Sequence, residues 1–427
     1  MRRWNSVVVV SALVLMAPAC SSGGGTVGGN SNPPDPNPPD PTALAGPFAF
    51  GVWLQDPVHQ SGGRTTAELY REMGITHWMG LYEWPSEANR YPGYNLHAAQ
   101  NLKDGGFMVY AGGDQSAIDW NAAHPEFADT FVGYLAGDEP DMTKQWVPAH
   151  HPDVFEATCE LLRTNDPSRD VWANFGKGFA KIPWPGYQAF PGPTIQDDHD
   201  KFTNFLDLVS VDFYGLTDSY EMPDYVGVWT YGKAIDNTRY YVDANPMNPG
   251  LPVWGFVETG NPWSQTSGLY PVMPPELIAP TVWNLIVHGA TGVIYFAHDF
   301  TAAGATGTYP IDHPEVGLAV RAANASVTAF GAVLAAPSEP GTTVTTDGGV
   351  GVVALTKRFQ GATYVFAMGD GNETYKHGLG VHAVIALPGA GDTVEVLGES
   401  RSLVRTGGSF TDWFGPYQLH VYRLAGN

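Results

Sequence analysis

The run Gly292-Val293-Ile294-Tyr295-Phe296 has no charged residue and no alternation of polar with apolar side chains. Such a run is typical of a strand in a parallel sheet, because a sheet covered on both sides needs apolar residues on both faces. A helical pattern follows the run, as in a βα unit. The stretch therefore predicts a buried parallel strand in an α/β protein.

Seven similar runs precede this one, and a helical pattern follows each of them. The predicted strands are 48–54, 77–82, 107–111, 131–136, 171–175, 208–213, 253–257 and 292–296. The predicted helices are 65–73, 95–103, 117–122, 154–162, 199–205, 232–242, 275–288 and 315–334. Eight consecutive βα units predict a closed (β/α)8 TIM barrel. An open doubly wound sheet is disfavoured, because residues 53–56 (Trp-Leu-Gln-Asp) are no phosphate-binding glycine turn.

The pattern changes near residue 341, where short alternating runs are separated by Gly, Asp and Asn. The strands predicted here are 351–355, 363–368, 381–387, 393–397 and 418–423. Short alternating strands with frequent turn residues are typical of a small antiparallel β-sandwich. We therefore expect a barrel over residues 47–336 and an accessory β-sandwich over residues 337–427.

The first 20 residues have the order of a secretory signal peptide. Arg2 and Arg3 precede an apolar run over residues 7–16, and small residues then lead to Cys20. The run is too short to span a bilayer as a permanent helix. A cysteine at this place resembles the cleavage site of a bacterial lipoprotein, so we expect Cys20 to be lipidated. Cleavage without a lipid is the alternative.

Residues 21–46 are rich in Gly, Ser and Pro, a composition that cannot bury a core and predicts a flexible tether. We therefore expect an exported protein of the bacterial cell envelope, held to a membrane by lipid on Cys20, or secreted if Cys20 carries none. The only other cysteine, Cys159, lies in a helical pattern and is interpreted as a buried apolar residue.

Composition restricts the partners of this chain. The formal net charge is −22, which repels nucleic acid and other polyanions, so no nucleic-acid partner is expected. Charged residues are only 15% of the chain, whereas aromatic residues are 12% and include 13 Trp. Trp and Tyr rings stack on the C–H faces of sugars, so the composition suits a neutral carbohydrate partner.

Polar residues at the carboxyl ends of barrel strands are the candidates for chemistry, because catalytic groups gather there. The set is Gln55, Asp56, Tyr82, Glu83, Trp84, Asp114, Asp138, Glu139, Asp141, Asn174, Lys177, Asp212, Tyr214, Glu258, His298 and Asp299. It contains no zinc-type His spacing, no nucleophile elbow and no phosphate loop, so neither a metal nor a cofactor is expected. Paired carboxylates suit glycosidic bond cleavage, in which one acid protonates the departing oxygen and the other captures the sugar.

The motif Gly137-Asp138-Glu139-Pro140, together with Glu258 at the end of the seventh strand, resembles clan A of the retaining glycoside hydrolases. The resemblance implies that Glu139 is the acid/base and Glu258 the nucleophile, with Asp138 left open as the alternative proton donor. It also implies that a strand-six tyrosine, matched by Tyr214, hydrogen-bonds the nucleophile. A β-sandwich packed on the barrel is a further implication, with residues 414–422 resembling its last strand.

Two positions depart from the clan. Asp138 stands where the clan usually has an Asn that contacts the sugar 2-hydroxyl. A carboxylate there can still accept that hydrogen bond, and when ionised it would raise the pKa of Glu139 by repulsion. The clan also tends to have Trp on strand eight, where this chain has Phe296, Ala297 and His298.

Further site residues are predicted around the two glutamates. Substrate contacts are expected from Asp138, Tyr214, Trp53, Glu83, Trp84, Asp114, Asn174, Trp263 and His298. Burial under loops is an equal alternative for the three Trp residues among them. Trp172, Trp254 and Trp283 are expected in the core, and residues 197–200 (Asp-Asp-His-Asp) are interpreted as a solvated turn capping a helix.

The leading hypothesis is a retaining glycoside hydrolase that acts outside the cytoplasm on a poly- or oligosaccharide. The alternative is a catalytically inactive barrel that binds glycans at the cell surface. A third hypothesis keeps the enzyme but assigns inversion or transglycosylation. Retention requires a carboxyl separation of about 5 Å, whereas inversion requires more than about 6 Å.

Overall fold

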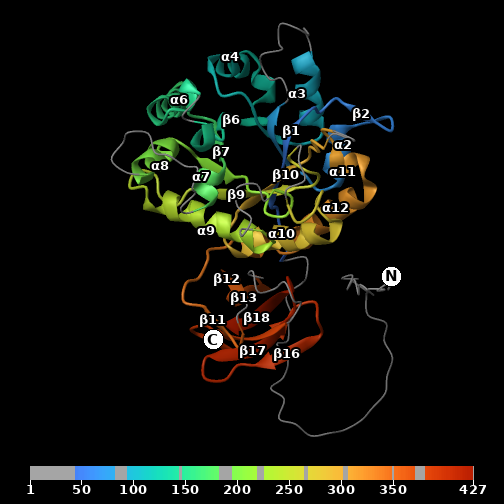
Figure 1. Cartoon of the computed structure of the whole chain (residues 1–427), viewed down its shortest axis with the longest axis vertical. Helices are drawn as coiled ribbons and strands as arrows, with labels where there is room; N and C mark the ends of the chain where they lie inside the picture. Colours follow the sequence, from blue (N-terminus) through green and yellow to red (C-terminus); the bar gives the residue numbers. More distant parts are fainter. Residues whose placement is uncertain are drawn as a thin grey trace.

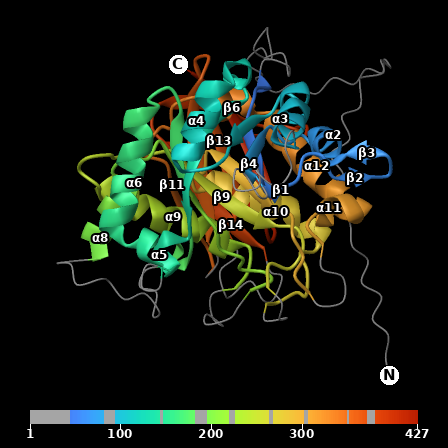
Figure 2. The same ribbon diagram turned by 90° about the horizontal axis from the view of Figure 1, so that it is seen from above.

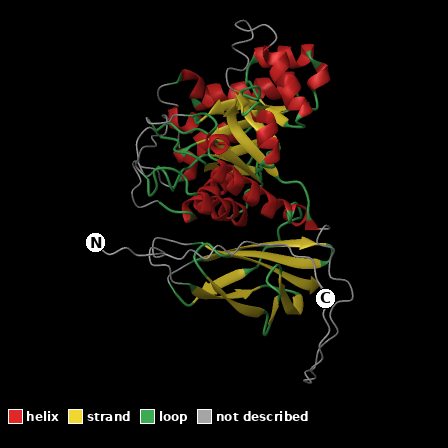
Figure 3. Ribbon diagram, turned by 90° about the vertical axis from the view of Figure 1, so that its right-hand side faces the viewer, coloured by secondary structure: helices red, strands yellow, loops and turns green. Residues whose placement is uncertain are grey.

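The computed structural model describes residues 44–81, 94–143, 147–181, 195–218, 226–263, 268–301, 306–348, 351–370 and 380–426. A ring of helices surrounds a central set of parallel strands, and a second layer made of antiparallel strands lies beneath it (Figures 1 and 3). The predictions for the signal peptide and Cys20 lie outside the described residues. In the described part of the chain, none of the helices has the length and apolar character needed to cross a membrane.

The eight parallel strands close into a barrel in the order β1-β10-β9-β8-β7-β6-β5-β4. Their bounds are β1 Ala49–Gln55, β4 His77–Leu81, β5 Met108–Tyr110, β6 Phe131–Asp138, β7 Asp170–Phe175, β8 Leu208–Val211, β9 Val253–Glu258 and β10 Gly292–Phe296. Each lies within two residues of a predicted strand at both ends, so the predicted TIM barrel is confirmed. The small hairpin of β2 (Gln60–Ser61) and β3 (Arg64–Thr65) is an insertion after β1.

Helices surround the barrel, with α6 and α8 on one side of the strands and α2, α3 and α12 on the other (Figure 2). The larger helices are α2 Thr66–Glu72, α3 Tyr94–Asp104, α4 Gln115–Ala123, α6 Pro152–Asn165, α8 Ile195–Thr203, α9 Trp229–Ala244, α10 Pro275–Val287 and α12 Pro314–Thr328. Single turns form α5 Pro140–Thr143, α7 Lys177–Ala180, α11 Tyr309–Asp312 and α13 Gly331–Leu334. Local signals define several starts, such as the capping box of Thr65 and Glu68 before α2.

Aromatic side chains fill the inside of the barrel. Trp53 packs edge-on against Trp172 and Phe256, with ring centroids 5.7 and 5.8 Å apart. Tyr110 and Trp254 belong to the same buried cluster. Trp172, Trp254 and Trp283 are all buried, as predicted. The barrel interior is thus a packed core, so a catalytic site is expected at the carboxyl ends of the barrel strands.

The C-terminal region forms two antiparallel sheets, β12-β13-β18-β15-β16 and β11-β14-β17. The strands are β11 Thr343–Thr346, β12 Val352–Phe359, β13 Ala362–Gly369, β14 Val381–Ala386, β15 Ala390–Val396, β16 Arg401–Val404, β17 Ser409–Phe414 and β18 Leu419–Gly426. The predicted β-sandwich is confirmed, but sequence reasoning missed β11, β16 and β17. All three are edge strands, and the four-residue strands β11 and β16 have no buried residue, so these two give a weak hydrophobic signal.

The β-sandwich packs on helix α10 of the barrel. Trp283 stacks on Phe366 of β13, with ring centroids 5.8 Å apart and an interplanar angle of 19°. Asn284 donates a hydrogen bond to Asp370 Oδ1 over 2.9 Å, and His288 bridges Asp236 of α9 and the same Asp370 oxygen. Apolar and polar contacts therefore both connect the two layers seen in Figure 3.

The structure also places Cys159 and the residues at the start of the barrel region. Cys159 is a free, buried cysteine on α6, as expected for a core residue. The chain is already packed against the barrel at residue 44, because Leu44 is buried and the Gly46 N–H donates to Thr328 O over 3.0 Å.

Candidate active site

Glu139 lies directly after β6 in an unusual backbone conformation. Its φ is +46°, in the left-handed region that glutamate rarely adopts. Its N–H donates to Asn174 O over 2.8 Å, and its C=O accepts from Met142 N over 3.0 Å. Strain of this kind persists only when surrounding bonds hold it, and it is common at functional sites.

Gly176, directly after β7, gives the Glu139 side chain its space. A Cβ at this glycine would lie 2.8 Å from Glu139 Oε1 and 2.6 Å from Met142 Cγ. Any larger residue would therefore displace the carboxyl group. Sequence reasoning missed this position, because nothing near Gly176 in the chain reveals what packs against it.

Asp141 is a buried carboxylate that joins the turn after β6 to helix α7. Its Oδ1 accepts from Gly176 N over 3.0 Å, and its Oδ2 accepts from Phe179 N over 3.2 Å. Burial raises the pKa of Asp141 to about 6, although the backbone donors oppose the shift. The residue holds Gly176, and with it the wall behind Glu139.

Asp138 is exposed at the end of β6, where Asn174 Nδ2 donates to its Oδ1 over 2.9 Å. The other end of the amide, Asn174 Oδ1, accepts from Ser210 Oγ over 2.8 Å. Asn174 is 1% exposed, and protein partners engage both of its amide ends, so its predicted substrate contact stays a prediction. Its role is to orient Asp138.

The pKa of Glu139 is raised to about 8. Burial is the largest cause, and the carboxylates of Asp138 and Asp141 add to it by repulsion. Hydrogen bonding with Asp212 and the charge of Lys177 oppose the shift. Glu139 is therefore set to hold its proton near neutral pH, as a general acid must.

Glu258 ends β9 in a different environment, with 0% of its surface exposed. Tyr231 O–H lies 2.6 Å from Glu258 Oε1 and 2.7 Å from Oε2, and Thr217 O–H donates to Oε1 over 3.0 Å. Burial raises the pKa of Glu258 to about 7, while these donors hold it down. The hydroxyl donors thus offset part of the cost of burying an ionised Glu258.

The tyrosine beside Glu258 is not the one predicted. Tyr214 O–H donates to Asp212 Oδ2 over 3.3 Å, so the expected bond from Tyr214 to Glu258 is wrong. Tyr231 makes that bond instead, from the first turn of α9 in the same βα unit. The loop after β8 turns back so that Leu216 N donates to Tyr231 O–H, an arrangement that strand periodicity does not report.

Two other predicted substrate contacts have structural roles. Trp53 is 4% exposed and packs inside the barrel, so its prediction as a sugar platform is wrong. The Asp114 carboxylate caps helix α4 by accepting from Ala117 N over 3.0 Å, and it also accepts from Ser116 Oγ. Local capping explains why Asp114 follows β5.

Four predicted contacts stay untested, two at described residues and two at residues that the structure does not describe. Trp263 is 46% exposed after β9 and stays a candidate sugar platform. His298 lies 3.3 Å from Gln55 Nε2 through its Nε2 and stacks on Phe300 with centroids 5.6 Å apart. Burial lowers the pKa of His298. Glu83 and Trp84 lie outside the described residues.

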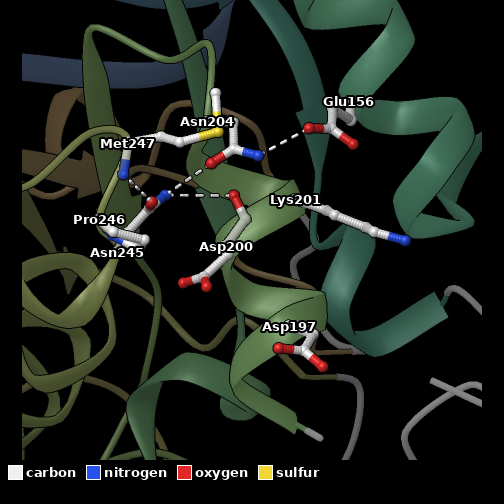
Figure 4. Close-up of a pocket in the computed structure, with 8 residues that line it drawn as sticks. All are labelled: Glu156, Asp197, Asp200, Lys201, Asn204, Asn245, Pro246 and Met247. Atoms are coloured by element: carbon white, nitrogen blue, oxygen red, sulfur yellow. Dashed lines mark hydrogen bonds between the residues drawn. The ribbon is translucent and has the colours of Figure 1, made fainter. Parts of the chain in front are cut away.

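Residues 197–200 are not a solvated turn, contrary to the prediction. They lie within α8, and His199 is buried against Tyr241 with ring centroids 3.7 Å apart. An open pocket of about 380 Å³ adjoins this helix (Figure 4). Its lining is Glu156, Asp197, Asp200, Lys201, Asn204, Asn245, Pro246 and Met247.

This pocket is separate from the glutamates. Asn204 and Asn245 precede β8 and β9, so the pocket lies toward the amino ends of the strands, opposite the end that carries Glu139 and Glu258. Among the residues that the structure describes, no group of three or more His, Cys, Asp or Glu is placed to hold a metal ion.

Comparison with family models and with curated proteins found no match. Among solved structures, the chain is similar to a noncanonic maltogenic α-amylase from Thermotoga neapolitana, with a TM-score of 0.51 and 8% identity over 89% of this chain and 99% of that one. A GH30 endoxylanase from Clostridium papyrosolvens C71 aligns with a TM-score of 0.41 and 14% identity, covering 90% of this chain and 97% of that one. A family 51 α-L-arabinofuranosidase from Bifidobacterium longum aligns with a TM-score of 0.46 and 10% identity, covering 89% and 97%. Since these identities carry the fold alone, the conclusion is architectural: the chain is a (β/α)8 barrel followed by an antiparallel β-sandwich.

Proposed function

We propose that this protein is a retaining glycoside hydrolase that cleaves O-glycosidic bonds in a neutral poly- or oligosaccharide. Glu139 is the acid/base and Glu258 is the nucleophile in this proposal. The observation that carries it is the pair of glutamates at the carboxyl ends of β6 and β9, each in a specialised environment. One solved structure of similar fold is a maltogenic α-amylase, and it supports a carbohydrate substrate.

The two environments suit two successive displacements. In the first, the Glu258 carboxylate attacks the anomeric carbon while Glu139 gives its proton to the departing oxygen, so that a glycosyl ester forms on Glu258. In the second, Glu139 takes a proton from water as the water attacks the same carbon and releases Glu258. Tyr231 and Thr217 support Glu258 as a carboxylate, and the raised pKa of Glu139 keeps its proton available.

The test is a screen of neutral polysaccharides, followed by kinetics of Glu139→Ala and Glu258→Ala on the best substrate. Each variant should lose most of kcat, and azide should restore turnover as a glycosyl azide in one of them. Glu160→Ala, on the exposed face of α6, is the control and should behave as wild type. Full activity in Glu258→Ala would reject the assignment.

Product stereochemistry tests the retaining mechanism separately. The anomer released first, followed by proton NMR, should keep the configuration of the substrate. Release of the opposite anomer would assign inversion to the same two residues.

A second function, glycan binding by an inactive barrel, is favoured by one observation. Glu258 is fully covered, and both of its oxygens are within hydrogen-bond distance of Tyr231 O–H. A nucleophile must reach the substrate, so the enzyme proposal requires this carboxylate to become accessible when substrate binds. Glycan binding without hydrolysis across the whole panel would support the binding function instead.

We also propose that the chain is exported and attached to a membrane through lipid on Cys20. The proposal rests on the signal-like order of residues 1–20. Labelled fatty acid should enter the wild-type protein and the Cys159→Ala variant but not Cys20→Ser, and Cys20→Ser should leave the membrane fraction. Label in Cys20→Ser would contradict the proposal.

A further inference from the structure

Asp212, directly after β8, has a carboxyl oxygen that its surroundings do not satisfy. Its Oδ1 is buried and accepts no hydrogen bond from any described residue, whereas its Oδ2 accepts from Tyr214 O–H over 3.3 Å. A buried carboxylate oxygen without a donor is costly, and such an atom requires an explanation. A protonated Asp212 would remove the cost, because its oxygen would then donate.

The Glu139 carboxyl group is the partner for that donor. The Asp212 side chain lies close enough to the Glu139 carboxyl group for a hydrogen bond between them to lower the pKa of Glu139. Two ionised carboxylates offer only acceptors, so this bond requires a proton on one of them. Gly176 leaves room for this carboxyl group, because a Cβ there would lie 2.8 Å from Glu139 Oε1.

The charges around the pair decide which residue holds that proton. Asp138 of β6 and Asp141 of α5 both repel an ionised Asp212, as Glu139 does. Lys177 of α7 acts on Glu139 and pairs with Asp218 over 3.2 Å. Tyr214 donates to Asp212, and burial together with nearby carboxylates, Glu258 among them, raises the pKa of Tyr214. Burial and the three carboxylates raise the pKa of Asp212 well above its ordinary value, so Asp212 keeps its proton and can donate it to a Glu139 oxygen whether or not Glu139 is itself protonated.

We propose that Asp212 is a positioning residue that stays protonated and donates a hydrogen bond from Oδ1 to the carboxyl group of Glu139. This inference rests on the proposed function, in which Glu139 is the acid/base. When Glu139 passes its proton to the departing oxygen, the electron pair of the broken O–H bond stays on Glu139. The bond from Asp212 then stabilises the new carboxylate, and Asp212 keeps its own proton until Glu139 regains one from the attacking water.

Two substitutions with opposite chemistry test the inference through the pH profile of kcat/KM. Asp212→Asn keeps a neutral donor, so the alkaline limb, which reports Glu139, should stay near its wild-type position. Asp212→Ala removes the donor, so the limb should move about 1–2 pH units to higher pH and kcat should fall. A move of the Asp212→Asn limb to lower pH by a unit or more would show that Asp212 was ionised and would overturn the inference.

A measurement without turnover separates this inference from the proposed function. Infrared difference spectra of the whole protein at neutral pH should contain C=O stretches of buried carboxylic acids, that of Glu139 among them, and Asp212→Asn should remove the band that belongs to Asp212. Asp153→Asn is the control, because contact with Lys201 lowers the pKa of Asp153 and the band should persist. An unchanged band in Asp212→Asn would overturn the inference. Absence of hydrolysis with loss of the band would reject only the function.

Discussion

The ends of β6 and β9 carry the same residue type in opposite surroundings. At the end of β6, Glu139 is partly exposed, has a strained backbone and lies among Asp138, Asp141 and Asp212. At the end of β9, Glu258 is fully buried, in regular strand conformation, and receives hydroxyl donors from Tyr231 and Thr217.

Because the two residues are of the same type, the groups around each glutamate must determine whether its carboxyl group is protonated or ionised. Nearby carboxylates favour a protonated Glu139, because a second negative charge is repelled. Hydroxyl donors favour an ionised Glu258, because they hydrogen-bond the charged form. Pairs of acids with divergent environments are the pattern expected of an acid and a nucleophile. Four predictions test this comparison, from the largest effect to the smallest.

Replacing each glutamate by glutamine should separate the two roles most strongly. Glu258→Gln should lose about 10⁴-fold or more in kcat with every substrate, because no covalent intermediate can form. Glu139→Gln should lose about 10²–10⁴-fold with natural substrates and much less with aryl glycosides whose leaving groups need no proton. Steady-state kinetics with a series of aryl glycosides measures this. Equal losses in both variants, independent of the leaving group, would contradict the comparison.

Tyr231→Phe should weaken only the β9 site. The variant removes the hydroxyl group that lies within hydrogen-bond distance of both Glu258 oxygens, so kcat should fall about 10–100-fold. The acidic limb of kcat/KM should move to higher pH, because losing a donor to the charged form raises the pKa of Glu258. Tyr240→Phe, exposed on the same helix, is the control. A shift of the alkaline limb alone would show that Tyr231 affects Glu139 and not Glu258, and would contradict the comparison.

Gly176→Ala should disturb only the β6 site. The new Cβ would clash with Glu139 Oε1 and Met142, so we expect about 1–3 kcal/mol of destabilisation together with lower kcat. Gly351→Ala is the matched control, since its Cβ would meet Asp370 only at ordinary contact distance, 3.6 Å. Denaturant unfolding and kcat measure the two effects. Wild-type values for Gly176→Ala would show that the Glu139 carboxyl group does not lie against Gly176.

The pH dependence of stability should show the smallest effect. Glu139 has a folded-state pKa of about 8, above its ordinary value, so the unfolded chain loses this proton first as pH rises. Stability should therefore fall between about pH 4.5 and pH 8, and Glu139→Gln should flatten this fall.

At pH 8, Glu139→Gln should melt about 2–5 °C higher than wild type. Glu258→Gln should change in the same direction but by less, because the pKa of Glu258 is raised only to about 7. Thermal melts from pH 5 to pH 9 provide the measurement. A lower melting temperature for Glu139→Gln at pH 8 would mean that the folded protein favours the ionised carboxylate.

Much of the fold was predictable because its signals are local. The apolar composition of runs such as residues 292–296 predicts buried strands, and the regular alternation of these runs with helical patterns predicts the barrel. The edge strands β11 and β16 were missed because they are short and have no buried residue, and β17 was missed as well. The order of the eight predicted barrel strands was enough to place Glu139 and Glu258 at the carboxyl ends of strands.

The partners of the two glutamates were not predictable in the same way. Tyr231 is 27 residues from Glu258 along the chain, and it reaches the carboxylate only because α9 packs beside β9. Trp53 follows a strand as a sugar platform would, yet barrel closure places it inside the core.

By itself, the sequence determined the eight βα units, the sandwich that follows them and the strand ends on which the acids lie. Only the tertiary structure decided that Tyr231 rather than Tyr214 bonds Glu258, that Asn174 orients Asp138, and that Asp212 meets Glu139. The physical reason is range. Hydrophobic periodicity depends on residues that are close together in the sequence. Hydrogen bonds and pKa values at the site depend on atoms that are distant in the sequence and come together only when the barrel closes.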